Sequence, residues 1–144
     1  MSKTSSTLHQ SVESLKKATQ ELGEKASWAP LGKGRTALNQ VAECALISGA
    51  CIGIIQNKAV PEMDWEAFGK AQDALAADAD AAYASLTSNT EGLVAALDGL
   101  SAEDAAIEVT MPWGATYTLA GLADVVYWNN TYHEGQINYI STLV

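Results

Sequence analysis

One segment near the C-terminus combines side chains that bind ions and ligands with the spacing of a helical face. Residues 128–140 read WNNTYHEGQINYI. Side chains three and four positions apart lie on the same face of an α-helix. That face carries Leu119, Leu122, Val126, Asn129, His133, Gln136 and Ile140. Three polar residues thus stand where a helix normally packs against the core, and each one left buried without a partner would cost about 1–3 kcal/mol. The segment is therefore the strongest candidate for a functional site.

One carboxylate lies within an otherwise apolar helical pattern earlier in the chain. Residues 36–56 are predicted to form a helix that begins at the N-cap Thr36 and is apolar almost all the way round. Glu43 lies on one stripe of that helix, together with Gln40 and Ile47. The periodicity leaves open whether Glu43 points to the interior or to solvent.

The same apolar periodicity predicts two further helices and marks where the last helix begins. Apolar residues recur at helical spacing over residues 8–26 and 70–97, and the last helix is predicted over 118–140, with Thr118 as its cap. Residues 57–64 are expected to form a loop that leads into a short turn at 65–68, and Asn89 and Gly92 mark a kink. We therefore expect an all-α fold of four helices in a single domain, residues 1–144.

Residues 101–118 depart from the helical pattern. Ile107, Val109 and Met111 alternate with polar residues, and a Pro-Trp-Gly turn centred on Trp113 separates them from a β-prone Thr-Tyr-Thr. This pattern predicts a small β-hairpin or an extended crossover before the last helix. Trp113 is either a hydrophobic clamp for the hairpin or a lid over a pocket.

Composition limits the classes of function. The chain of 144 residues has a formal net charge of −9 and only eight Lys and Arg residues, which argues against nucleic-acid binding. Its longest apolar run, residues 45–55, is interrupted by Ser48, Gly49 and Gly53 and falls short of the roughly 20 residues of a membrane span. The first residues lack the apolar stretch of a secretory signal, so a cytoplasmic protein that does not enter membranes is expected.

The two cysteines are not expected to form a disulfide. Cys44 and Cys51 lie seven residues apart on one predicted helix, which separates their Cα atoms by about 10 Å. This distance exceeds the limit of about 7 Å for a disulfide. The favoured interpretation is two packed core thiols, and the alternative is a redox or ligand role.

The order of the elements and the last segment resemble the DinB-like superfamily of helical-bundle proteins, also called the damage-inducible or YfiT-like group. The resemblance rests on four helices with a hairpin before the last, and on the sequence NNTYHEGQINYI. It implies a four-helix bundle in up-down-down-up order and a homodimer. It also implies a divalent metal, usually nickel or zinc, held by a histidine of the second helix and an H-x3-H pair of the last. The corresponding residues in this chain are Glu43, Asn129 and His133.

This chain departs from the family pattern at two of the three ligand positions. Residues at i and i+4 converge on one ion, and Asn129 and His133 keep that spacing. An asparagine carbonyl is a poor ligand for zinc or nickel, whereas a carboxylate such as Glu43 is a good one. Two alternatives follow: a weak metal site completed by waters, or a metal-free network in which Glu43 accepts a hydrogen bond from His133 while Asn129 and Gln136 satisfy the remaining groups. A third is that Glu43 faces solvent.

Two functional hypotheses follow. Family resemblance implies a metal-assisted, thiol-dependent transferase or hydrolase, in which Glu43 and His133 are ligands or acid and base groups and Tyr132, Trp113 and Gln136 line the pocket. The alternative is a non-catalytic, homodimeric binding or stress-response protein that has lost the metal and takes a small-molecule ligand. A stripe of Trp128, Tyr132, Gly135 and Tyr139 on the last helix is a candidate for self-association or a cover for the bundle edge.

Overall fold

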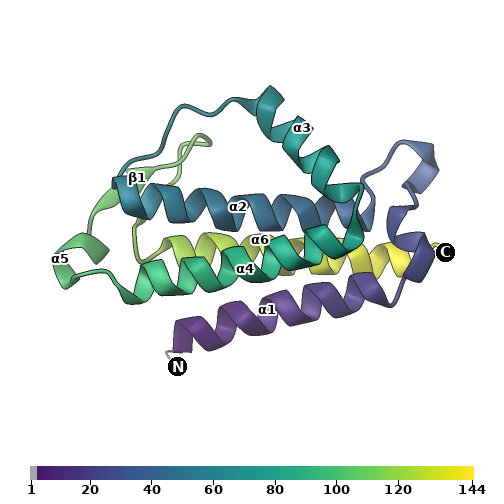
Figure 1. Cartoon of the computed structure of the whole chain (residues 1–144), viewed down its shortest axis with the longest axis horizontal. Helices are drawn as coiled ribbons and strands as arrows, with labels where there is room; N and C mark the ends of the chain where they lie inside the picture. The colour runs from purple at the N-terminus through teal and green to yellow at the C-terminus, as the bar shows by residue number, and fades with distance from the viewer. Residues whose placement is uncertain (1–2) are drawn as a thin grey trace.

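Long helices packed side by side dominate the computed structural model, which describes residues 3–144. Those longer than fifteen residues are α1 (Lys3–Gln20), α2 (Ala37–Asn57), α4 (Ala79–Asp98) and α6 (Leu122–Ser141). In Figure 1, α1 and α6 run from left to right, and α2 and α4 run from right to left. The closest packing joins α2 to α4 and α1 to α6. The predicted all-α class is confirmed.

Shorter elements connect the long helices. They are the 3₁₀ turns η1 (Gly23–Ser27) and η2 (Pro30–Gly32), helices α3 (Trp65–Ala76) and α5 (Ala102–Ala105), and strands β1 (Glu108–Thr110) and β2 (Thr116–Thr118). Helix α3 lies obliquely over α2 and carries the chain back across the molecule, so that α2 and α4 run in the same direction (Figure 1).

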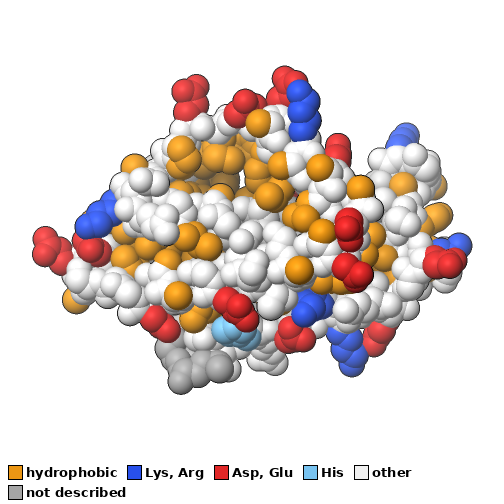
Figure 2. Space-filling model, in the orientation of Figure 1, with side chains coloured by type: hydrophobic (Ala, Val, Ile, Leu, Met, Phe, Trp, Pro, Cys, Tyr) orange, Lys and Arg blue, Asp and Glu red, His pale blue; other side chains and the backbone are white. Residues whose placement is uncertain are grey.

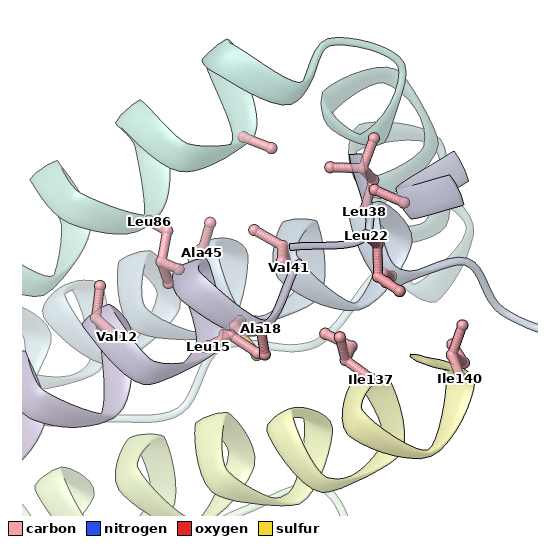
Figure 3. Packing of buried hydrophobic residues seen from close by; sticks show 14 residues of the cluster. Val12, Leu15, Ala18, Leu22, Leu38, Val41, Ala45, Leu86, Ile137 and Ile140 are labelled. Carbon is pink, nitrogen blue, oxygen red and sulfur yellow. The ribbon is translucent and has the colours of Figure 1, made fainter. Parts of the chain in front are cut away.

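The core lies between the four long helices. Figure 3 shows Val12, Leu15, Val41, Leu86 and Ile137 pointing toward one another from α1, α2, α4 and α6. The predicted inward face of the last helix is largely confirmed. Its positions Leu119, Leu122, Val126, Asn129, His133 and Ile140 are buried, and Gln136 is exposed. Asn130, next to this face, is buried too, so three polar side chains of α6 lie in the protein interior.

The N-cap predicted for the second helix is confirmed. The Thr36 hydroxyl accepts a hydrogen bond from the backbone N–H of Asn39 at 3.0 Å. This bond satisfies one of the donors that every helix start leaves free. It fixes where α2 begins, and hence which face of α2 carries Gln40 and Glu43.

Three predicted helix boundaries are wrong. The last helix begins at Leu122 and is not capped by Thr118, which ends strand β2. The first helix ends at Gln20 rather than near residue 26, because Gly23 has a φ of +55° and the chain continues as the 3₁₀ turn η1. The stretch predicted as one helix over 70–97 is two helices, α3 and α4, and α3 already begins at Trp65. The break falls at Asp78, whose side chain accepts a hydrogen bond from the backbone N–H of Ala81 and so starts α4.

The predicted kink at Asn89 and Gly92 is absent, because α4 is one helix from Ala79 to Asp98. Both residues serve the contact with α2 instead. The Asn89 amide donates to the backbone carbonyl of Ala45 at 2.9 Å. A Cβ added at Gly92 would lie 2.9 Å from the Ile52 side chain. The small residue lets the two parallel helices come close.

The predicted hairpin is confirmed as a two-stranded antiparallel ribbon. Val109 of β1 is paired with Tyr117 of β2, and Gly114 takes a φ of +88° in the turn between the strands. Val109 and Met111 are buried against the helices. An isolated two-stranded ribbon is only marginally stable, so this packing holds it in place beside the start of α6.

Helix α2 is long and apolar enough to span a membrane by length and composition, although no membrane span was expected. In its most apolar window, 56% of the residues are buried inside the protein. The central position of α2 between α4, α3 and α6 accounts for this apolar character. A core helix passes the same length and composition criteria, so they are weak evidence for a span.

Candidate functional site

His133 is the centre of a buried polar network between α2 and α6. Only 2% of His133 is exposed. Its Nε2 lies 3.0 Å from Glu43 Oε1, and its Nδ1 lies 2.9 Å from Gln40 Oε1 and 2.8 Å from Gln136 Oε1. Both ring nitrogens thus face acceptor oxygens. Whichever ring nitrogen carries a proton therefore has an acceptor oxygen within hydrogen-bond distance.

Helix periodicity brings these four side chains together. Gln40 and Glu43 are three residues apart on α2, and His133 and Gln136 are three residues apart on α6. Each pair therefore lies on one face of its helix, and the two faces meet where α2 and α6 pack. Glu43 points toward His133, which answers the question that periodicity left open.

Arg35 holds the other carboxylate oxygen of Glu43. Its guanidinium lies 2.6 Å from Glu43 Oε2, and its Nε donates to Asn39 Oδ1 at 2.8 Å. Arg35 immediately precedes the N-cap of α2, eight residues and so about two helical turns before Glu43, and its side chain reaches along the helix surface to that carboxylate. Burial acts to raise the pKa of Glu43, but the hydrogen bond from His133 and the charges of Arg35 and His133 outweigh it and lower the pKa below its ordinary value. Glu43 is therefore a fixed negative charge.

Asn129 lies close to this network but is hydrogen-bonded to a cysteine. Its side-chain amide donates to Cys44 Sγ at 3.4 Å. Burial raises the pKa of the Cys44 thiol well above its usual range. Cys44 is therefore a neutral core thiol, and both cysteines are free and buried, as predicted. The three residues of the predicted metal site, Glu43, Asn129 and His133, lie in the same part of the α2–α6 interface, but the Asn129 amide is directed to the Cys44 sulfur.

A cleft of about 760 Å³ opens beside the network. Glu43 and Asn129 lie on its wall, and aromatic side chains come from three other parts of the chain. These are Trp65 and Phe68 of α3, Trp113 and Tyr117 of the hairpin, and Trp128 of α6. Figure 2 shows hydrophobic side chains gathered around a hollow below α3. The volume is within the range of about 300–1,000 Å³ that is typical of small-molecule pockets.

The cleft concentrates the large aromatic residues of the protein. It is lined by three of the four tryptophans and by the only phenylalanine. Trp65, Trp113 and Trp128 are 57%, 52% and 62% exposed. Burying such side chains against a partner is strongly favourable, and contiguous exposed apolar surface marks ligand or protein binding sites.

A second, more open hollow of about 510 Å³ lies on the other side of the network. Arg35, Gln40, Tyr132 and Gln136 are among the residues that line it. Tyr132 packs edge-on against the His133 ring, with centroids 5.2 Å apart, and stacks on Trp128 at 5.3 Å. Of the residues predicted to line a pocket, Trp113 lies in the aromatic cleft, as the lid alternative requires, whereas Tyr132 and Gln136 lie here.

Several residues of the site were missed by reasoning from the sequence. Gln40 stood on the same predicted stripe as Glu43, and this spacing was a signal that went unused. Arg35 precedes its helix and has no periodic signal. Trp65 and Phe68 lay in a segment predicted as a short turn, and nothing in the sequence indicates that α3 folds back over α2 and meets the hairpin.

The donor chemistry favours the metal-free alternative over a zinc or nickel site. Glu43 and His133 are turned toward each other at hydrogen-bond distance, and the Arg35 guanidinium already supplies a positive charge to the carboxylate. Asn129 is directed to Cys44. In residues 3–144, no group of three or more His, Cys, Asp and Glu side chains is arranged to hold a metal ion.

Comparison of the chain with models of protein families and with curated proteins found no match.

Proposed function

We propose that this protein binds a small, largely apolar molecule in the aromatic cleft and acts as a binding protein rather than as an enzyme. The observation that carries the proposal is the convergence of Trp65, Trp113 and Trp128 on a cleft of about 760 Å³ from α3, the hairpin and α6. Each of these tryptophans is about half exposed, with a large apolar area that a ligand would remove from water.

The polar network gives the cleft a rigid, charged wall. Glu43 has one oxygen on His133 and the other on Arg35, so its side chain is fixed before a ligand arrives. Preorganised groups reduce the entropy that binding costs. A carboxylate with a lowered pKa is a poor proton acceptor at neutral pH, which supports an anchoring role over general-base catalysis.

Titration with a neutral fluorescent probe such as phenylnaphthylamine tests this proposal. We expect saturable binding with one site per chain, weakened at least about tenfold by Trp113→Leu or Trp128→Leu, since each change removes a large ring from the wall. Trp28→Phe is the matched control, because Trp28 packs on the core away from the cleft and its loss should leave the affinity unchanged. Probe binding that is absent, or that is insensitive to the cleft variants, would refute the proposal.

A metal-assisted, thiol-dependent transferase or hydrolase of the DinB-like type is the second candidate. The observation that favours it is the Glu43–His133 pair beside a ligand-sized cleft. The order of the four long helices, taken as an up-down-down-up bundle, also supports membership of that superfamily. Metal analysis separates the two candidates: the enzyme requires nickel or zinc that raises the melting temperature, an effect lost in Glu43→Ala and His133→Ala. The binding protein predicts no such rise.

We propose further that the chain forms a cytoplasmic homodimer through the part of the aromatic stripe of α6 that lies outside the cleft. Tyr132 and Tyr139 are 50% and 66% exposed there, whereas Trp128 lines the cleft. Light scattering should then give twice the chain mass, and Tyr139→Glu should reduce it to one chain, because a charge within the interface opposes burial. A monomeric mass for the unaltered protein would exclude the dimer.

A further inference from the structure

We infer that the ligand of the aromatic cleft is an organic monocation, a positively charged nitrogen carried on an apolar group. This inference rests on the proposed function, because it names the chemical class of the molecule that the cleft binds. It follows from which charges line the cleft, which rings surround them and how the charges are compensated.

The charged side chains on the cleft wall are carboxylates. Glu43 and Asp124 line it, and among the described residues no Lys, Arg or His does so. Glu43 is paired with Arg35 and hydrogen-bonded to His133, and neither of these side chains lines the cleft. Asp124 is exposed and takes part in no ion pair within residues 3–144, although it also borders a neighbouring hollow that Lys3 lines. Both charged side chains on the cleft wall are thus negative, which favours a cation over an anion as the ligand.

The rings on the wall suit a cation as well as an apolar group. The electron-rich face of an indole attracts an ammonium or guanidinium group more strongly than other aromatic rings do. Trp65, Trp113 and Trp128 bring three indoles from three elements to the same cleft. Ile47 and Val125 extend the apolar part of the wall, so the cleft offers carboxylates and rings to the charge and aliphatic surface to the rest of the molecule.

Asp124 also lies in the first turn of α6, where a carboxylate stabilises a helix whether or not it binds a ligand. This structural role predicts an effect on stability only. The ligand role predicts an effect on the affinity for cations. Asp80 provides a matched comparison, because it is likewise an exposed carboxylate in the first turn of a long helix, α4, and lies away from the cleft.

Three probes that share a naphthalene ring test the inference, and the first two of them also share one shape. They are trimethyl(naphthylmethyl)ammonium, its uncharged carbon isostere neopentylnaphthalene, and the anion naphthylacetate, each titrated against the full chain by tryptophan fluorescence. We expect the cation to bind about tenfold more tightly than the isostere, and the anion to bind most weakly. Added salt should weaken binding of the cation and leave the isostere unaffected.

Two variants then test whether the Asp124 carboxylate is the charge that attracts the cation. Asp124→Asn should weaken binding of the cation about threefold to tenfold and leave the isostere unchanged, and Asp80→Asn should alter neither. Cation and isostere binding with equal affinity would overturn the inference while the proposed function stands. Failure of all three probes to bind, in a protein that melts cooperatively, would overturn the proposed function itself. An Asp124→Asn variant with full affinity for the cation would contradict the inferred role of Asp124.

Discussion

At Glu43 and His133, the ring nitrogens and carboxylate oxygens all have side-chain partners. His133 has an oxygen acceptor at each ring nitrogen, and Glu43 has a donor at each oxygen. The sequence pattern predicted the helical face of His133, and the resemblance to a family pointed to Glu43 as its partner. Neither predicted Arg35, because the contact depends on how the chain enters α2 and not on a repeat.

Acid should weaken this pair. The folded-state pKa of Glu43 is lowered, so the stability that its ionised form contributes is fully present above the ordinary value of 4.5 and is lost as the pH falls through the lower folded value. Glu43→Gln should therefore be less stable than the unaltered protein by about 1–2 kcal/mol at neutral pH, because it loses an ion pair and weakens the bond to His133. Urea denaturation at several pH values should show this difference shrinking below about pH 4. A difference independent of pH would contradict the assignment.

The two cysteines should be unreactive in the folded protein. Burial raises the pKa of Cys51 to about 12 and raises that of Cys44 further. Because the thiolate is the nucleophile, a thiol reagent at about pH 8 should modify both residues slowly in native protein and rapidly in urea. Fast modification of Cys44 without denaturant would show that its contact with Asn129 opens readily.

At the scale of elements, the break between α3 and α4 decides whether a cleft exists. One continuous helix over 70–97 would carry Leu75 and Leu86 along one straight face, and α3 would not lie over α2. The sequence did not reveal the break, since the alanines at 76–82 have high helix propensity and two residues, Asp78 and Asp80, could each cap a helix. The buried faces of α1 and α6 were predictable because tertiary packing follows their periodicity, whereas α2 is apolar on most sides and its periodicity did not decide the direction of Glu43.

Asp78 should therefore matter more than its neighbours. Its carboxylate accepts from the Ala81 N–H at 3.1 Å and begins α4. Asp78→Ala should lower the free energy of unfolding by about 1 kcal/mol, whereas Asp80→Ala, in the same turn but not at the cap, should lower it by less than about 0.5 kcal/mol. Urea denaturation of the two variants tests this difference, and equal effects would argue that Asp78 is not the residue that begins the helix.

At the scale of the whole molecule, the aromatic cleft exists only because the tertiary fold brings separate elements together. Trp65, Trp113 and Trp128 are separated by 48 and 15 residues along the chain, and each belongs to a different element. Periodicity reports which face of one helix is buried, but it carries no information about which exposed residues of separate elements meet. The polar face of α6 was therefore predictable from the sequence, while the cleft beside it required the fold.

The most direct measurement follows the four tryptophan indole N–H resonances by NMR while the neutral probe phenylnaphthylamine is added. Trp65, Trp113 and Trp128 line the cleft, and Trp28 packs on the core elsewhere. We predict that three resonances shift together and saturate at one probe per chain, while the resonance of Trp28 stays in place. Resonances that do not move, or four that move alike without saturating, would contradict a ligand-binding cleft.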